Sequence, residues 1–296
     1  MGSVIGRIAA FVLAGTLGAA SVAAPVRLDV HPSDTDRGIE HADSPHVVFR
    51  EGADSHAPLL VFLPGTGGET LRAVTTERVF LADALAQGYR FIILSYIDSP
   101  AVAQVCRPSN ADRDCANRFR EERAFGDGSN PPIGDAPQDA IVHRLSALLR
   151  YLSTKDPDGH WEAYLEGDQP SWSRIVLSGQ SQGGGMAAFI AKRIAVHGVI
   201  DFSGGWDMES DAKVASWYAA PSATPPDRYF GTYHVKEKFA KVIAASYQAM
   251  QFPPEQQFAL DKPVSHPDDE NPGHGDGASN PVYEAIWLTM LKRLNP

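Results

Sequence analysis

Short runs of apolar residues alternate along the chain with stretches in which apolar residues recur every three or four positions. The runs are typical of strands buried on both faces, and the spaced stretches are typical of amphipathic helices. The predicted strands cover residues 59–63, 89–95, 174–179, 196–203 and 228–234. This alternation is typical of the α/β class, so we expect a mostly parallel central sheet with helices on both faces.

The helical spacing predicts helices over about 75–87, 141–152, 183–194, 239–250 and 283–294. Between the second strand and the second helix, residues 98–134 are rich in proline and mixed charge, which indicates a loop insertion. This segment is a candidate lid or specificity loop, with Phe119 and Phe125 as its apolar content. The last two predicted strands have no large helical insertion between them, so a large cap domain is not expected.

The N-terminus resembles a targeting segment. Arg7 precedes an apolar run over residues 8–20, and small residues lead up to Ala23. A short positive region, an apolar stretch and a small-residue cleavage site describe a secretory signal peptide. The run is shorter than the roughly 20 residues that a membrane span needs, which disfavours an uncleaved anchor. We therefore expect a signal peptide at 1–23, a single folded domain at 24–296, and an exported product, periplasmic or secreted, without stable membrane insertion.

The charge balance argues against two classes of binding partner. The 296 residues include 26 Lys and Arg against 36 Asp and Glu, a formal net charge of −10. Nucleic-acid binding needs a basic footprint to neutralise phosphates, and no basic run or basic amphipathic helix is present. Nucleic acids and anionic membrane surfaces are therefore not expected as partners.

The chain has two cysteines, Cys106 and Cys115, nine positions apart in a segment of turn-forming residues. In an oxidising compartment two neighbouring cysteines usually pair, and such a bond would restrain a loop that has little apolar content. The spacing fits neither a CxxC redox motif nor a zinc cluster. We expect a disulfide without chemical function and no metal site.

The pattern Gly179-Gln180-Ser181-Gln182-Gly183 joins a predicted strand to a predicted helix. A sharp turn in this place holds the serine in a strained conformation, and small flanking residues leave its hydroxyl exposed above the sheet. The helix that follows offers free N–H groups to a developing oxyanion. The context therefore favours Ser181 as a nucleophile over a glycine-rich turn with an incidental serine.

A second glycine-rich turn, Pro64-Gly65-Thr66-Gly67-Gly68, follows the first predicted strand. Glycines allow backbone to approach a substrate closely, so the N–H of Thr66 or Gly65 can form an oxyanion hole with that of Gln182. The turn lacks the lysine of a P-loop and the spacing of a dinucleotide fingerprint, which disfavours phosphate binding.

The general base should be a histidine late in the chain, because the order in this kind of fold is Ser, acid, His. Three histidines lie at suitable positions, His234, His266 and His274. His274 stands in a glycine-containing loop just before the last predicted helix, from which a side chain can reach back to the serine. We therefore predict His274 as the base.

The acid is less well defined by the sequence. Glu237 follows the strand at 228–234 and begins the next helix, which is the expected place for a triad acid. Asp207 follows the preceding strand and is the alternative acid, and Glu237 could also be a charge in the first turn of a helix. The remaining candidates are Asp211, Asp261 and the acidic run at 268–270.

The segments GQSQGG, PGTGG and GHG resemble those of the α/β-hydrolase superfamily, and the chain is most similar to its exported bacterial serine hydrolases. The resemblance runs over about residues 45–294. It implies Ser181 as nucleophile, Thr66 and Gln182 as oxyanion donors, and His274 as base. The chain departs from the common pattern at His234, where many members carry the acidic residue, and this leaves the acid open between Glu237 and Asp207.

These residues predict two-step acyl transfer without a cofactor, on a small-molecule or polymeric ester. A peptidase or amidase would use the same machinery, although no anchor for a peptide terminus is recognisable. The third hypothesis for the function is a non-catalytic binding protein on the same fold, and the presence of Ser181 and His274 argues against it. Trp206, just past a strand, either lines an acyl pocket or belongs to the core.

Overall fold

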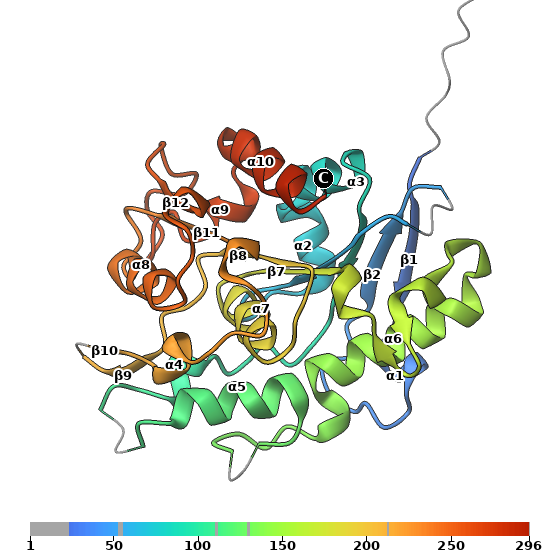
Figure 1. Cartoon of the computed structure of the whole chain (residues 1–296), viewed down its shortest axis with the longest axis horizontal. Helices are drawn as coiled ribbons and strands as arrows, with labels where there is room; N and C mark the ends of the chain where they lie inside the picture. The colour runs from blue at the N-terminus through green and yellow to red at the C-terminus, as the bar shows by residue number, and fades with distance from the viewer. Residues whose placement is uncertain (1–23, 53–55, 110–111, 129–130, 212, 296) are drawn as a thin grey trace, which may run out of the picture.

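The protein is described by a computed structural model that covers residues 24–52, 56–109, 112–128, 131–211 and 213–295 (Figure 1). The predicted signal peptide lies outside these residues. The centre is an eight-stranded sheet in the order β1-β2-β4-β3-β7-β8-β11-β12. The run from β4 to β12 is parallel, whereas β1 pairs antiparallel with β2 and β2 with β4.

The strands of this sheet are β1 (Val26–Val30), β2 (His46–Arg50), β3 (Leu59–Leu63), β4 (Arg90–Ile93), β7 (Ile175–Gln180), β8 (Gly198–Phe202), β11 (Tyr229–His234) and β12 (Gln257–Leu260). Two small hairpins lie outside it, β5 (Leu165–Glu166) with β6 (Gln169–Pro170) and β9 (Met208–Ser210) with β10 (Lys213–Val214). The five predicted strands correspond to β3, β4, β7, β8 and β11, within two residues at each end. Three strands of the sheet were not predicted. The edge strands β1 and β12 are partly exposed and lack a continuous apolar run, and β2 has only three apolar residues in a row.

Helices cover both faces of the sheet. One face packs on α5 (Cys115–Phe125), α6 (Ile141–Lys155), α7 (Gln182–Arg193) and α8 (Ala240–Ala249). The other packs on α2 (Thr70–Thr76), α3 (Arg78–Ala86), α9 (Asp276–Ser279) and α10 (Glu284–Leu294). In Figure 1, α2, α3 and α10 lie above the sheet and α5 and α7 below it. The short helices are α1 (Pro32–Thr35) and α4 (Val102–Val105).

Strand β3 shows how the sequence builds these layers. Leu59, Val61 and Leu63 belong to the core under α6 and α7, whereas Leu60 and Phe62 belong to the core under α3 and α10. Successive side chains of a strand point to opposite faces, so a strand covered by helices on both sides is apolar throughout. The mostly parallel sheet with helices on both faces is therefore confirmed.

Two predictions about helices and loops were wrong. The predicted helix at 75–87 is two helices, α2 and α3, which meet at Glu77. The segment at 98–134, predicted as a loop, contains α4 and α5. Helix α5 was not predicted, because its buried face carries the charged side chains of Arg120, Glu122 and Arg123. Apolar residues therefore do not recur along it at helical spacing. Its Phe119 is fully buried in the core.

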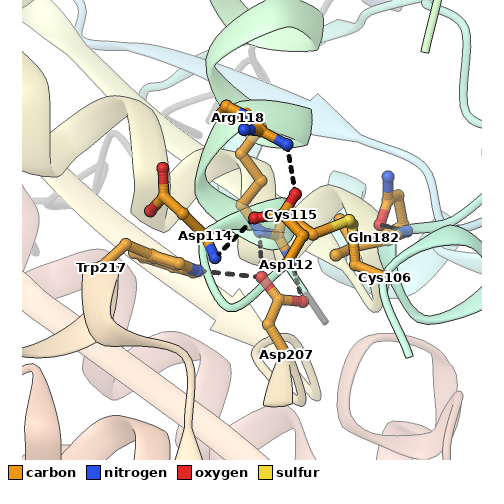
Figure 2. Close-up of a disulfide and its surroundings, with 10 residues drawn as sticks. Cys106, Asp112, Asp114, Cys115, Arg118, Gln182, Asp207 and Trp217 are labelled. Carbon is orange, nitrogen blue, oxygen red and sulfur yellow. Dashed lines mark hydrogen bonds and ion pairs between the residues drawn. A yellow bond between two sulfur atoms is a disulfide. The ribbon is translucent and has the colours of Figure 1, made fainter. Parts of the chain in front are cut away.

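The predicted disulfide is present. Cys106 and Cys115 are bonded, with their Cα atoms 5.5 Å apart, and the bond joins the end of α4 to the first residue of α5 (Figure 2). Both sulfurs belong to buried residues of the core that α5 helps to form. Within the described ranges, no helix has the length and apolar character needed to cross a bilayer.

Candidate active site

Ser181 stands at the sharp turn between β7 and α7. Its backbone has φ 58° and ψ −120°, a conformation that residues other than glycine rarely adopt. A Cβ at Gly183 would overlap the carbonyl oxygen of Leu63, and a Cβ at Gly179 would overlap the backbone of Gly183. The turn therefore requires glycine at both flanking positions, as the sequence pattern predicted.

A buried carboxylate, Asp201, lies beneath this turn. It comes from β8 and is fully buried, and its Oδ1 accepts a 2.8 Å hydrogen bond from the N–H of Gly204. A Cβ at Gly184, in the first turn of α7, would overlap the same carboxylate. Burial raises the pKa of Asp201 to about 7.

This raised pKa makes stability depend on pH. The folded protein keeps the proton of Asp201 to higher pH than the unfolded chain, so the contribution favours folding in acid and is lost as the pH rises to about 7. The Asp201→Asn variant lacks this titration. Between about pH 4 and about pH 8, the free energy of unfolding of the variant should therefore rise, relative to that of the wild type, by on the order of 4 kcal/mol. Denaturant unfolding at both pH values measures this difference, and a difference that stays constant with pH would contradict the assignment.

His274 and Glu237 form the second part of the site. The His274 Nδ1 lies 2.8 Å from Oε2 of Glu237, which is fully buried, whereas the imidazole is 22% exposed. The other carboxylate oxygen accepts hydrogen bonds from the Ser203 hydroxyl at 2.7 Å and from the His234 N–H at 2.6 Å. Gly273, with φ 80°, brings the loop against the ring of His234. Since the carboxylate accepts, Nδ1 carries the proton and Nε2 is left as the basic nitrogen.

Asp207, the alternative acid, belongs to a different cluster. Arg120 donates to it from Nε at 2.5 Å and from its terminal nitrogen at 2.8 Å. The Trp217 indole also donates to it, at 2.9 Å (Figure 2). Arg120 and Asp207 are both 2% exposed. Within the described chain no hydrogen bond joins Asp207 to His274. The same holds for the remaining acid candidates, Asp211, Asp261 and residues 268–270. The structure therefore brings Glu237, and not Asp207, to the imidazole.

The predicted oxyanion donors meet at a small cavity. Thr66, Ser181 and Gln182 line this space of about 10 Å³ together. The Gly68 N–H donates to Gly65 at 2.9 Å and the Gly67 N–H to Asp98 at 3.1 Å, which holds the PGTGG turn in place. In the part of the chain that the structure describes, the backbone N–H groups of Thr66 and Gln182 have no partner. Two free donors beside a hydroxyl are what an oxyanion hole requires.

The comparisons with known proteins concern the fold. No protein-family model matches the chain, and no curated protein matches it in sequence. Among solved structures, esterase B from Lactobacillus rhamnosis is similar over 92% of this chain and 85% of its own, with a TM-score of 0.53 and 12% identity. A truncated carbohydrate esterase from gut microbiota is similar over 93% of this chain and 98% of its own, with a TM-score of 0.53 and 12% identity. This chain has the α/β-hydrolase fold.

The candidate residues occupy the places that an α/β-hydrolase gives to its site. Ser181 is at the strand–helix elbow, and the chain order Ser181, Glu237, His274 is that of nucleophile, acid and base in this fold. The predicted second oxyanion donor, Thr66, lies in the turn after β3. At 12% identity the likeness concerns the fold, so the chemistry is argued from these residues.

Gln180 belongs to the candidate site, and the sequence did not predict it. Its amide nitrogen lies 3.1 Å from the carbonyl oxygen of His274 and 3.2 Å from the ring Nε2. The carbonyl can only accept, so the amide nitrogen is a donor and Nε2 accepts from it. No hydrogen bond joins Ser181 to His274 among the described residues. In this arrangement Gln180 therefore occupies the lone pair that would receive the proton of Ser181. Its place beside the nucleophile in G-x-S-x-G is the only sequence signal for it.

A larger groove of about 490 Å³ is also lined by Thr66. Gln180 and His274 line it, together with residues of α2 and of the loop before α9. His266, the weaker candidate for the base, also lies on this groove, and no hydrogen bond joins it to Glu237 in the described chain. Among the described residues, no three His, Cys, Asp or Glu side chains gather in a way that could hold a metal ion.

Proposed function

We propose that this chain is a serine hydrolase that cleaves a carboxylic ester through an acyl-enzyme. Ser181 is the nucleophile, His274 the general base and Glu237 the acid, and the backbone N–H groups of Thr66 and Gln182 form the oxyanion hole. The observation that carries the proposal is the buried Glu237 carboxylate, 2.8 Å from the imidazole of His274, beside a serine in a strained elbow.

The reaction begins with the movement of one proton. Glu237 holds the Nδ1–H of His274, which leaves Nε2 to receive the proton of Ser181. The Gln180 amide has to leave Nε2 for this to happen, because a neutral imidazole nitrogen has a single lone pair. Ser181 Oγ then attacks the carbonyl carbon, and the tetrahedral oxyanion accepts from the N–H groups of Thr66 and Gln182.

The second half returns the site to its starting state. The imidazolium of His274 donates its Nε2 proton to the oxygen of the leaving alcohol, and the C–O bond of the ester breaks. A water molecule then gives a proton to His274 and attacks the acyl-Ser181 carbonyl. As the second tetrahedral intermediate collapses, His274 returns this proton to Ser181 Oγ, the bond from Oγ to the acyl carbon breaks, and the carboxylic acid is released.

Esters are the proposed substrates because an alkoxide leaves more readily than an amide nitrogen, and the site shows no added device for amine departure. The two solved structures compared above are named as esterases, which supports this choice. We also propose export, with a signal peptide at 1–23 and a mature domain at 24–296. The Cys106–Cys115 bond supports an oxidising compartment.

A matched pair of chromogenic substrates tests the reaction class. The purified protein should hydrolyse p-nitrophenyl acetate with a kcat/KM at least about a hundredfold above that for p-nitroacetanilide, the corresponding amide, since the machinery has to expel a poorer leaving group from the latter. Peptide p-nitroanilides should not be cleaved. Comparable turnover of ester and amide would identify an amidase or peptidase, and no turnover of any substrate would identify a non-catalytic protein.

A further inference from the structure

We infer that this hydrolase removes short acyl groups, of acetyl size, from neutral alcohols that carry several hydroxyl groups. The inference rests on the proposed function and adds the two halves of the substrate to it. Two spaces lined by Thr66 carry the argument, namely the cavity of about 10 Å³ at Ser181 and the groove of about 490 Å³ at His274. We call them the acyl cavity and the alcohol groove.

The chemistry decides which half of the ester enters which space. The leaving oxygen receives its proton from His274, so the alcohol has to lie on the side of His274, which lines the groove. The acyl carbon bonds to Ser181, and its oxygen points to Thr66 and Gln182, all of which line the cavity. Thr66 lines both spaces, so the ester bond fits at their boundary and the acyl chain extends into the cavity.

The acyl cavity accepts a group of about the size of one water molecule. Its walls are Trp206, Ala101, Ala103 and the buried ion pair of Arg120 with Asp207. The methyl of an acetyl group comes closest to this size, whereas a propyl chain exceeds it and would have to displace a wall or extend out of the cavity. The acetyl group is therefore the expected acyl half.

The side chains that form these walls pack against other side chains. The Trp206 ring packs 4.7 Å from that of His274 and 5.1 Å from that of Phe239, measured between ring centroids. The Arg120 guanidinium lies 5.3 Å from the centre of the Trp217 ring, and Trp217 also donates to Asp207 (Figure 2). Displacing the ion pair would leave a buried charge without its partner, which is costly. The cavity is therefore unlike an apolar pocket that repacks around longer chains.

The alcohol groove is large, and many hydrogen-bonding side chains line it. Besides His274 and Gln180, hydrogen-bonding side chains line it from α2 and the residue before it, from the loop before α9 and from α9. They include Glu69, Arg72, Thr76, Asp269, Asn271 and Ser279. Donors and acceptors of this kind match hydroxyl groups, which both donate and accept. A hydrocarbon would instead leave these groups without partners.

The charges and rings of the groove exclude two other alcohols. The exposed acids of the groove, Glu69, Asp269 and Glu270, outnumber Arg72, its single Lys or Arg side chain, so an anionic alcohol would be repelled. Phe62 is the only phenyl, phenol or indole side chain on the groove, and it is 1% exposed. Recognition of a quaternary ammonium group uses exposed aromatic faces, which this surface does not offer. A neutral alcohol rich in hydroxyl groups remains.

Two substrate series test the two halves separately. Across p-nitrophenyl acetate, butanoate and hexanoate, kcat/KM should fall at least about tenfold at the first step, because the added carbons exceed the cavity. Methyl 6-O-acetylglucoside and cyclohexylmethyl acetate share the acetyl group and the six-membered ring, and differ in hydroxyls. The sugar ester should have the higher kcat/KM by at least about tenfold, since only its hydroxyls pair with the groove.

Variants connect each preference to its space. Trp206→Ala should raise the ratio of butanoate to acetate turnover at least about tenfold. The ratio is the readout, because Trp206 also packs on His274 and its loss slows both substrates alike. Arg72→Ala should lower turnover of the sugar acetate relative to p-nitrophenyl acetate at least about fivefold. Arg78→Ala is the matched control, exposed on the next helix and outside the groove, and should change neither rate.

The outcomes separate this inference from the proposed function. Equal turnover of acetate and hexanoate would overturn the acyl half, and a preference for cyclohexylmethyl acetate would overturn the alcohol half, while ester hydrolysis itself stands in both cases. A preference for acetylcholine over its uncharged isostere 3,3-dimethylbutyl acetate would also overturn the neutral alcohol. Absence of all ester hydrolysis would instead remove the proposed function.

Discussion

Replacing Ser181 with alanine should lower kcat/KM for p-nitrophenyl acetate by at least about 10⁴-fold, on the scale of a lost nucleophile. The melting temperature should change by less than about 3 °C, since the Ser181 hydroxyl forms no hydrogen bond in the described chain and little stability is lost with it. Steady-state kinetics and thermal unfolding measure the two effects.

A control serine makes the result specific. Ser173 is exposed and lies just before β7, and Ser173→Ala should keep wild-type activity. If Ser181→Ala retained more than a few per cent of the activity, the nucleophile would have to be another group. A variant that loses activity together with its cooperative unfolding would reflect damage to the elbow.

Glu237→Gln should lose at least about a hundredfold in the rate of acylation. The Ser203 hydroxyl and the His234 N–H both donate to one oxygen of the carboxylate, so the single amide oxygen of glutamine has to stay with them. The amide NH₂ then faces His274 Nδ1, which becomes an acceptor, and the proton moves to Nε2. That tautomer cannot receive the proton of Ser181. Pre-steady-state kinetics with a chromogenic ester measure the acylation step.

Asp207→Asn should instead lower stability strongly and the rate of acylation only slightly. Acylation should fall less than about tenfold, because Asp207 stands outside the path of the proton. Stability should fall by about 3–5 kcal/mol, since Arg120 is left buried without its counter-charge. Denaturant unfolding measures the second effect. The reverse ranking of the two variants in acylation would move the acid to Asp207, and near-normal acylation in both would remove both from the proton path.

The strands were predictable because each central strand is buried on both faces and therefore carries an uninterrupted apolar run, as in β3 and β7. The elbow was predictable for a local reason as well, because its glycines and serine are adjacent in the sequence. Helix α5 was not, since Arg120 and Arg123 are buried in it through ion pairs with Asp207 and Asp135. Such pairs depend on segments that are distant along the chain.

The contacts around His274 also join segments that are distant along the chain, which limited their prediction for the same reason. Position along the chain favoured Glu237 over Asp207, but it could not show that Arg120 pairs with Asp207. The bond from Gln180 to His274 spans 94 positions, and that from Ser203 to Glu237 spans 34. Side chains brought together only by the sheet edge leave no periodic signal. The two spaces that define the inferred substrate likewise arise from the packing of separate segments.

Fluorophosphonate labelling followed by peptide mapping tests the central claim most directly, because the reagent bonds covalently to an activated serine. The account predicts one adduct per chain, on Ser181, and a strong loss of labelling in Glu237→Gln but not in Asp207→Asn. An adduct on a different residue, or no adduct on protein that hydrolyses esters, would contradict it.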